Sequence, residues 1–142
     1  MTRYETIEAP GAQPASPGFV PRDDEEELPR LLLRPCFPVD GEILLIAGFD
    51  AFDRLLCLER AESDRAGRCI VPPPVWRAAL ETKPAQIVMA HNHPSGIARP
   101  SDADLAATRE STRFLALLGV TLSDHMIFTA DGHFSFWRAG LL

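Results

Sequence analysis

An apolar run at residues 85–90, with the sequence AQIVMA, is the feature that most constrains how this chain can fold. The run has the length of a strand and lacks the alternation of polar and apolar residues that a strand with one wet face would show. A strand of this kind needs cover on both faces. The sequence therefore predicts a sheet in which this strand is buried above and below.

Four further segments have the composition of strands, namely residues 42–49, 55–63, 120–128 and 133–137. The first two are separated by a short polar turn, and the last two flank Ala130-Asp131-Gly132, which is a hairpin signal. Two helices lie between the strands. Prolines at 72–74 suit the first turn of a helix ending near residue 84, and a longer helix is expected from Ser101 to Leu118, capped by Gly119. This order predicts an α/β (α+β) fold, a mixed sheet flanked by helices.

The N-terminal part of the chain has a different composition. Residues 1–38 hold seven of the thirteen prolines and an acidic run at 23–27. Such a segment buries too little apolar surface to offset the cost of ordering it. We expect an acidic, proline-rich, flexible and disordered tail at residues 1–38, although the leucines at 31–33 could dock on the domain. A single domain is expected at 39–142.

The charge pattern narrows the class of partner. The net charge is −6, the arginines are scattered, and Lys83 is the only lysine, so no direct binding of duplex DNA is expected. No run approaches the about 18 consecutive apolar residues of a membrane span, and no basic stretch leads into an apolar one. We therefore expect a cytoplasmic protein that does not associate with membranes. Cys36, Cys57 and Cys69 form no close pair and are expected to be free thiols.

Two histidines follow the buried strand directly. His91 and His93 stand two residues apart, and in an extended backbone such residues project from the same face. Zinc accepts histidine nitrogen, and a catalytic zinc site has three protein ligands and one position for water. Asp104 is the best third ligand, because the turn at 95–96 and the helix from Ser101 return it to the strand end. An anion in the first turn of a helix is also stabilised by the helix dipole.

Each part of this pattern has an alternative interpretation. An isolated H-x-H can be structural, and Ser101 with Asp104 matches a capping box that would do no more than stop a helix from fraying. The combination favours a metal site, since a fold does not need two histidines at that point for its stability.

The full string is His91-x-His93, seven residues, Ser101, two residues, Asp104. It resembles the JAMM metalloprotease motif with no departure in spacing, and HNHPSG with Pro100-Ser101 is similar to the RadC-like branch of the JAB/JAMM family. The resemblance covers about residues 40–142. It implies a JAB/cytidine-deaminase-like architecture, a Zn²⁺ ion held by His91, His93 and Asp104, and hydrolysis of peptide or isopeptide bonds in a peptide or protein substrate.

The same resemblance implies two catalytic residues. A glutamate from an earlier strand acts as general base in the family, and Glu42 stands at the start of the first predicted strand, close to the usual separation from His91. Glu59 and Glu62 are the reserve candidates. Ser101 would help to stabilise the oxyanion, since one hydroxyl can cap a helix and also donate.

Two other functions compete with this hypothesis. A non-catalytic RadC-like module that acts as a binding or scaffold protein, with a possible link to DNA repair, is the main alternative; the complete ligand set argues against it. A zinc deaminase would need H-x-E and a later P-C-x-x-C, and neither motif is present. Asp124-His125 could form a further metal pair, but a hydrogen-bonded structural residue or a support behind the ligands is the favoured interpretation.

Overall fold

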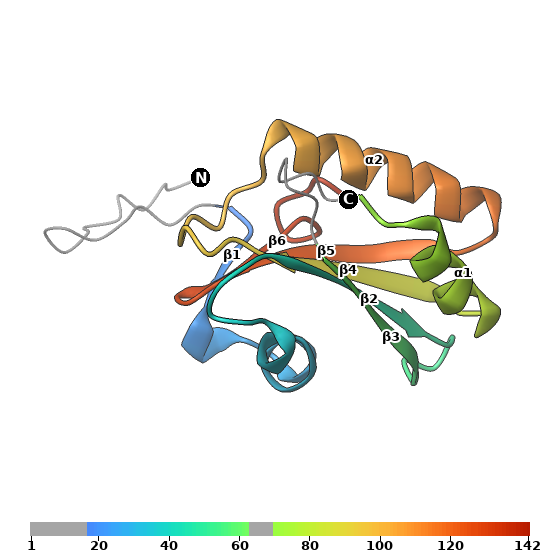
Figure 1. The fold of residues 1–142 in the computed structure, drawn as a ribbon, viewed down its shortest axis with the longest axis horizontal. Helices are drawn as coiled ribbons and strands as arrows, with labels where there is room; N and C mark the ends of the chain where they lie inside the picture. Colours follow the sequence, from blue (N-terminus) through green and yellow to red (C-terminus); the bar gives the residue numbers. More distant parts are fainter. Residues whose placement is uncertain (1–16, 63–69) are drawn as a thin grey trace, which may run out of the picture.

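The protein is built on one six-stranded mixed sheet (Figure 1), as seen in a computed structural model that describes residues 17–62 and 70–142. The strands are β1 (Phe19–Pro21), β2 (Ile43–Phe49), β3 (Leu55–Glu62), β4 (Gln86–Asn92), β5 (Thr121–Thr129) and β6 (Gly132–Ser135). Their order in the sheet is β1-β6-β5-β4-β2-β3. Only β4 and β5 run parallel, and the other neighbours are antiparallel. The predicted fold class is confirmed.

Two helices cover one face of the sheet, α1 (Pro73–Glu81) and α2 (Asp102–Leu117) (Figure 1). Both lie where the sequence placed them. Gly119 follows the end of α2 with φ +74, a left-handed conformation that glycine adopts without penalty. Neither helix in the described ranges is long and apolar enough to cross a membrane. Cys36 and Cys57 are free thiols, and Cys69 lies outside the described residues.

Strand β4 is buried on both faces, as its apolar run predicted. Ile87 and Met89 pack into the core on the side of the helices, whereas Val88 and Ala90 pack into a second core on the opposite side. This alternation assigns the faces for the residues that follow. By the same alternation, the side chain of His91 lies on the side of the helices, and that of Asn92 lies on the opposite side.

The second core is closed by the segment that we expected to be a tail. Residues 1–16 of that segment lie outside the described residues, but the part from Phe19 onward belongs to the domain. Strand β1 pairs with β6, and the helical turns η1 (Arg22–Asp24), η2 (Leu28–Leu33) and η3 (Arg34–Cys36) follow it below the sheet (Figure 1). Leu33 is fully buried. The predicted boundary at residue 38 is therefore too late in the chain.

A buried ionic cluster fixes this segment to the sheet. Glu25 accepts two hydrogen bonds of 2.6 Å from the guanidinium of Arg34, and a third of 2.6 Å from Nδ1 of His133 in β6. Arg34 also donates to the carbonyl oxygens of Thr129 and Gly132 at the two sides of the β5–β6 turn. Burial opposes the charge of Glu25, but the bonds from Arg34 and His133 hold the pKa of its carboxyl below the usual range. The cluster therefore holds a buried carboxylate that is paired on both oxygens.

Replacing Arg34 by methionine is expected to lower the free energy of unfolding by about 3–5 kcal/mol, because it leaves the buried Glu25 carboxylate without its cation. Urea denaturation measures the change. Arg30→Met is the matched control, since Arg30 is exposed on the same segment. Equal stabilities for the two variants would show that the segment is held by apolar packing alone.

Candidate metal centre

Two histidines project from the carboxyl end of β4 toward α2. His91 is the penultimate residue of β4, where it pairs with Leu44 of β2 and Ile127 of β5. His93 lies just beyond the strand, and its backbone N–H donates to the carbonyl of Phe128 at 2.9 Å. That bond keeps the chain extended beside β5 for one residue more. The two imidazoles consequently share one face, as the spacing predicted.

The first turn of α2 supplies a carboxylate to the same place. Ser101 is the N-cap, and its hydroxyl accepts the backbone N–H of Asp104 at 3.0 Å, while the Asp104 carboxylate accepts the N–H of Ser101 at 2.9 Å. This reciprocal capping box is the structure that the alternative interpretation predicted. It also aims Asp104 at the histidines, so the capping role and a ligand role are compatible.

The three side chains converge closely. His91 Nε2 lies 3.1 Å from His93 Nε2 and 3.3 Å from Asp104 Oδ1, and His93 Nε2 lies 3.4 Å from Asp104 Oδ2. Within the described ranges these residues form a group that could hold a metal ion. The Asp104 and His91 side chains are 1% and 7% exposed, whereas that of His93 is 19% exposed. Solvent therefore reaches the cluster on the side of His93.

A series of hydrogen bonds behind His91 fixes its ring with Nε2 turned toward the cluster. Thr108 must donate its hydroxyl hydrogen to the Asp104 carbonyl at 2.7 Å, because a carbonyl oxygen can only accept. Thr108 then accepts from Nδ1 of His125 at 2.6 Å. Burial holds the pKa of His125 well below its usual range, so this ring is neutral and its Nε2 accepts from Nδ1 of His91 at 2.8 Å. His91 is therefore held through Nδ1, and its Nε2 is the ring nitrogen that faces the cluster.

His93 is oriented in the same way by its own loop. Its Nδ1 donates to the carbonyl oxygen of Ile97 at 2.9 Å, which again turns Nε2 toward the cluster. The hydrogen bond to Asp104 raises the pKa of His93 against the effect of burial, and the charge of Glu42 acts in the same direction. Burial likewise opposes ionisation of Asp104, but the bonds to His91 and His93 bring the pKa of its carboxyl far below the usual range. The cluster therefore combines two imidazoles with an ionised carboxylate.

The expected general base lies beside this cluster. In the antiparallel β2–β4 pair, Leu44 faces His91, so extending the register by two residues places Glu42 opposite His93. The alternation along β2 directs Glu42 to the helix side, like Leu44. The negative charge of Glu42 also raises the pKa of His93, which agrees with this placement. Glu42 is half-buried at the solvent-accessible side of the cluster.

The reserve candidates lie further from the histidines. Glu59 pairs with Ile46, four residues along β2 from the level of Glu42, and one strand further from β4. Glu62 pairs with Ile43, whose side chain belongs to the core on the opposite face of the sheet. Geometry therefore favours Glu42 over both. Asp124 bonds to Ser135, Trp137 and the N–H of His125, so it supports β5 and is not in the histidine cluster.

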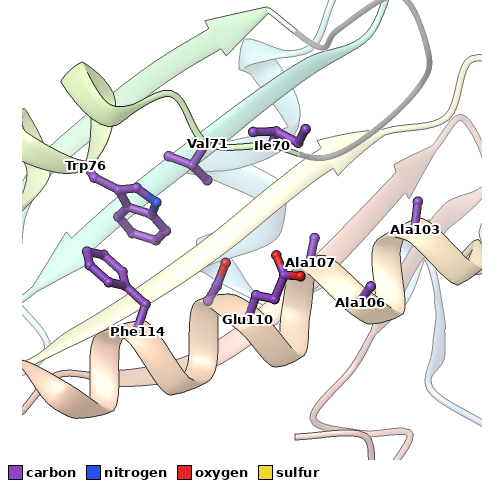
Figure 2. Close-up of a pocket in the computed structure, with 9 residues that line it drawn as sticks. Ile70, Val71, Trp76, Ala103, Ala106, Ala107, Glu110 and Phe114 are labelled. Carbon is purple, nitrogen blue, oxygen red and sulfur yellow. The ribbon is translucent and has the colours of Figure 1, made fainter.

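A groove of mixed polar and apolar lining runs along α2 (Figure 2). Its volume is about 430 Å³, and Ala103, which lines one end, is the residue before Asp104. Trp76 of α1 and Phe114 of α2 face each other at the other end, with ring centroids 5.4 Å apart. The remaining lining residues are Ile70, Val71, Ala106, Ala107, Glu110 and Ser111. The groove thus extends along α2 from Ala103, next to Asp104 in the sequence, to the aromatic pair of Trp76 and Phe114.

Comparison with known protein families matches residues 24–141 to the model of the RadC-like JAB domain. This chain belongs to the RadC-like JAB domain family. The matched range begins at Asp24, so it includes the ionic cluster below the sheet as well as the histidine cluster above it. The family resemblance seen in the sequence motif is confirmed.

Relatives of this RadC-like JAB domain include three bacterial UPF0758 proteins. Those of Paraburkholderia xenovorans and Burkholderia thailandensis are 37% and 39% identical over 100 residues, which is 70% of this chain. That of Alcanivorax borkumensis is 31% identical over 130 residues, or 91% of this chain. The chain spans 40%, 38% and 58% of the length of these relatives, respectively.

The donor set of this RadC-like JAB domain fits a zinc ion. Tetrahedral ligands at about 2.0–2.1 Å from an ion lie about 3.3–3.4 Å from one another. The two histidine nitrogens lie 3.1 Å apart, and each lies 3.3–3.4 Å from one of the two oxygens of Asp104, distances close to that separation. Two imidazole nitrogens and one carboxylate also form a donor set typical of catalytic zinc. His91, His93 and Asp104 would hold the ion.

The purified RadC-like JAB domain is expected to bind about one zinc ion per chain, and His91→Ala or Asp104→Ala should abolish that binding, because two ligands remain in each variant. Elemental analysis after gel filtration measures the zinc content. A wild type that is as free of metal as both variants after incubation with zinc would contradict the site.

His125→Phe is expected to weaken zinc binding by about tenfold to a hundredfold, because His91 Nδ1 loses its acceptor and the ring its fixed orientation. Phenylalanine keeps a flat ring against Phe136, on which His125 stacks at 4.6 Å. Competition with a chelator measures the affinity. Thr112→Val is the control, since Thr112 makes a similar hydroxyl bond one turn further along α2. Unchanged affinity in the phenylalanine variant would exclude the supporting role of His125.

Proposed function

We propose that this protein is a zinc-dependent hydrolase that cleaves an amide bond, peptide or isopeptide, in a peptide or protein substrate. One observation carries the proposal. The hydrogen bonds of His91 and His93 turn both Nε2 atoms toward a buried, ionised Asp104, within 3.1–3.4 Å of one another. Membership of a family that includes hydrolases supports it.

A bound zinc ion would supply Lewis acidity, which polarises a carbonyl group and makes water a stronger acid at neutral pH. The Glu42 carboxylate is then the group that moves the proton. It takes a proton from the attacking water as the new carbon–oxygen bond forms, and it returns that proton to the nitrogen as the carbon–nitrogen bond breaks. The products are a carboxylate and an amine. The place of Glu42 opposite His93, on the solvent-accessible side, suits this role.

Ser101 would stabilise the oxygen of the carbonyl as negative charge develops on it. Its hydroxyl oxygen already accepts the N–H of Asp104, and among the described residues its hydroxyl hydrogen has no recorded acceptor. Ser101 is exposed at the N-terminus of α2, next to the cluster. A hydroxyl fixed in this way donates without first having to reorganise.

The groove along α2 supports a substrate with an extended chain. One end is lined by Ala103, the residue before Asp104, and apolar side chains lie along it as far as Trp76 and Phe114. A peptide lying along α2 would bury apolar side chains there while its backbone crosses the cluster. A small polar substrate would leave this surface unused. The cytoplasmic location and the lack of duplex-DNA binding that the sequence led us to expect stay predictions.

Glu42→Gln is expected to keep zinc and to lower kcat by about a hundredfold to ten-thousandfold, because glutamine cannot accept the proton of water. A peptide-library cleavage assay on the zinc-loaded protein supplies a substrate, and steady-state kinetics then measure kcat. Glu59→Gln is the matched control and should keep full activity. A fully active Glu42→Gln would place the base elsewhere. A zinc-loaded wild type that cleaves no peptide or isopeptide would favour the non-catalytic binding module.

A further inference from the structure

The side chain of Asn92 forms a clamp on the backbone around Glu42. Its Oδ1 accepts the N–H of Ile43 at 2.9 Å, and its Nδ2 donates to the carbonyl of Gly41, also at 2.9 Å. Gly41 and Ile43 are the residues on either side of Glu42. Asn92 is 5% exposed, and its bond to Ile43 is buried, whereas its bond to the exposed Gly41 is only partly buried.

The two hydrogen bonds of Asn92 take the place of backbone hydrogen bonds between β2 and β4, which stop at this point. The β2–β4 ladder ends with the pair Leu44 and His91, and its register would next bring Ile43 opposite Asn92. The carboxamide of Asn92 has the same donor and acceptor groups as a peptide unit, and it meets the same strand. It therefore continues the hydrogen bonding of β2 past the last paired residue.

The residue before Glu42 is a glycine in the left-handed region. Gly41 is exposed, with φ +85, and apart from its chain neighbours no atom of the described residues lies within 4 Å of the position where a Cβ would stand. A glycine of this kind allows the backbone many conformations. The clamp from Asn92 fixes the carbonyl of Gly41 and the N–H of Ile43 at once, which limits the directions open to the Glu42 side chain.

We propose that Asn92 is a positioning residue that holds Glu42 in its orientation toward the metal site, a role that rests on the proposed function of Glu42. Strand geometry makes the arrangement possible. His91 and His93 face the helix side, and Asn92 between them faces the other side and reaches across to β2. One tripeptide thus contributes two metal ligands and the restraint on the base. A displacement of about 1 Å in a catalytic group can cost about a hundredfold in rate.

The test compares wild type, Asn92→Ala and Asn92→Leu, where leucine keeps the side-chain volume but makes no hydrogen bond. The control is Ser123→Ala, which removes a hydrogen bond of 2.7 Å from β5 to the side chain of Gln86, at the other end of β4 from Asn92. Hydrogen exchange of the Ile43 amide, zinc affinity, kcat and KM are measured for all four proteins.

Both Asn92 variants should exchange the Ile43 amide at least about tenfold faster than wild type, because its acceptor is gone. They should keep zinc affinity within about threefold and KM within about twofold, while kcat falls by about tenfold to a hundredfold. Ser123→Ala should match wild type in all four quantities. If Asn92→Ala does not accumulate in folded form, the leucine variant decides the question.

Unchanged exchange at Ile43, or unchanged kcat with faster exchange, would overturn the positioning role. Loss of zinc together with loss of kcat would show that Asn92 merely stabilises the end of β4, which also contradicts the proposal. A wild type that binds zinc and cleaves nothing would refute the proposed function and the catalytic part of this inference with it. In that case the exchange of Ile43 still decides whether the clamp exists in solution.

Discussion

Burial of β4 on both faces determines where every group in the site can point. A strand packed on two sides cannot slip by one residue, because each side chain would then enter the wrong core. Ile87, Met89 and His91 therefore stay on the side of the helices, and Val88, Ala90 and Asn92 stay on the other. His93, which follows the last residue of β4, keeps to the same alternation and lies on the side of the helices. The core below the sheet is thus as necessary to the histidines as the helices above it.

The polar groups around His91 form a buried hydrogen-bond network, and a member left without its partner would lower the stability of the fold. His125 is fully buried, yet both of its ring nitrogens have partners, one on β4 and one on α2. This series of hydrogen bonds ends at the backbone carbonyl of Asp104, and the side chain of the same residue belongs to the histidine cluster. The series therefore links strand β4, strand β5 and helix α2. Such a network rigidifies a site when every member is satisfied.

The sequence alone predicted the parts that local patterns encode. The strands of the core, both long helices and the spacing of His91, His93 and Asp104 follow from periodicity, capping residues and turn signals, all of which act within a few residues. It allowed the leucines at 31–33 to dock on the domain, but it did not predict that residues 19–36 as a whole would fold against the sheet. β1 is three residues long, and proline occurs in β1, η2 and η3, so this segment gains its order from partners more than 90 residues away. The clamp from Asn92 was missed for the same reason, since it acts across strands on residues 49 and 51 positions earlier.

X-ray absorption spectroscopy of the zinc-loaded protein tests the metal site most directly, because it reports the atoms around the metal. We predict nitrogen and oxygen neighbours only, at about 2.0–2.1 Å, and the outer-shell scattering of two imidazole rings. Sulfur at about 2.3 Å, which would come from a cysteine, or a shell without imidazole scattering would contradict it.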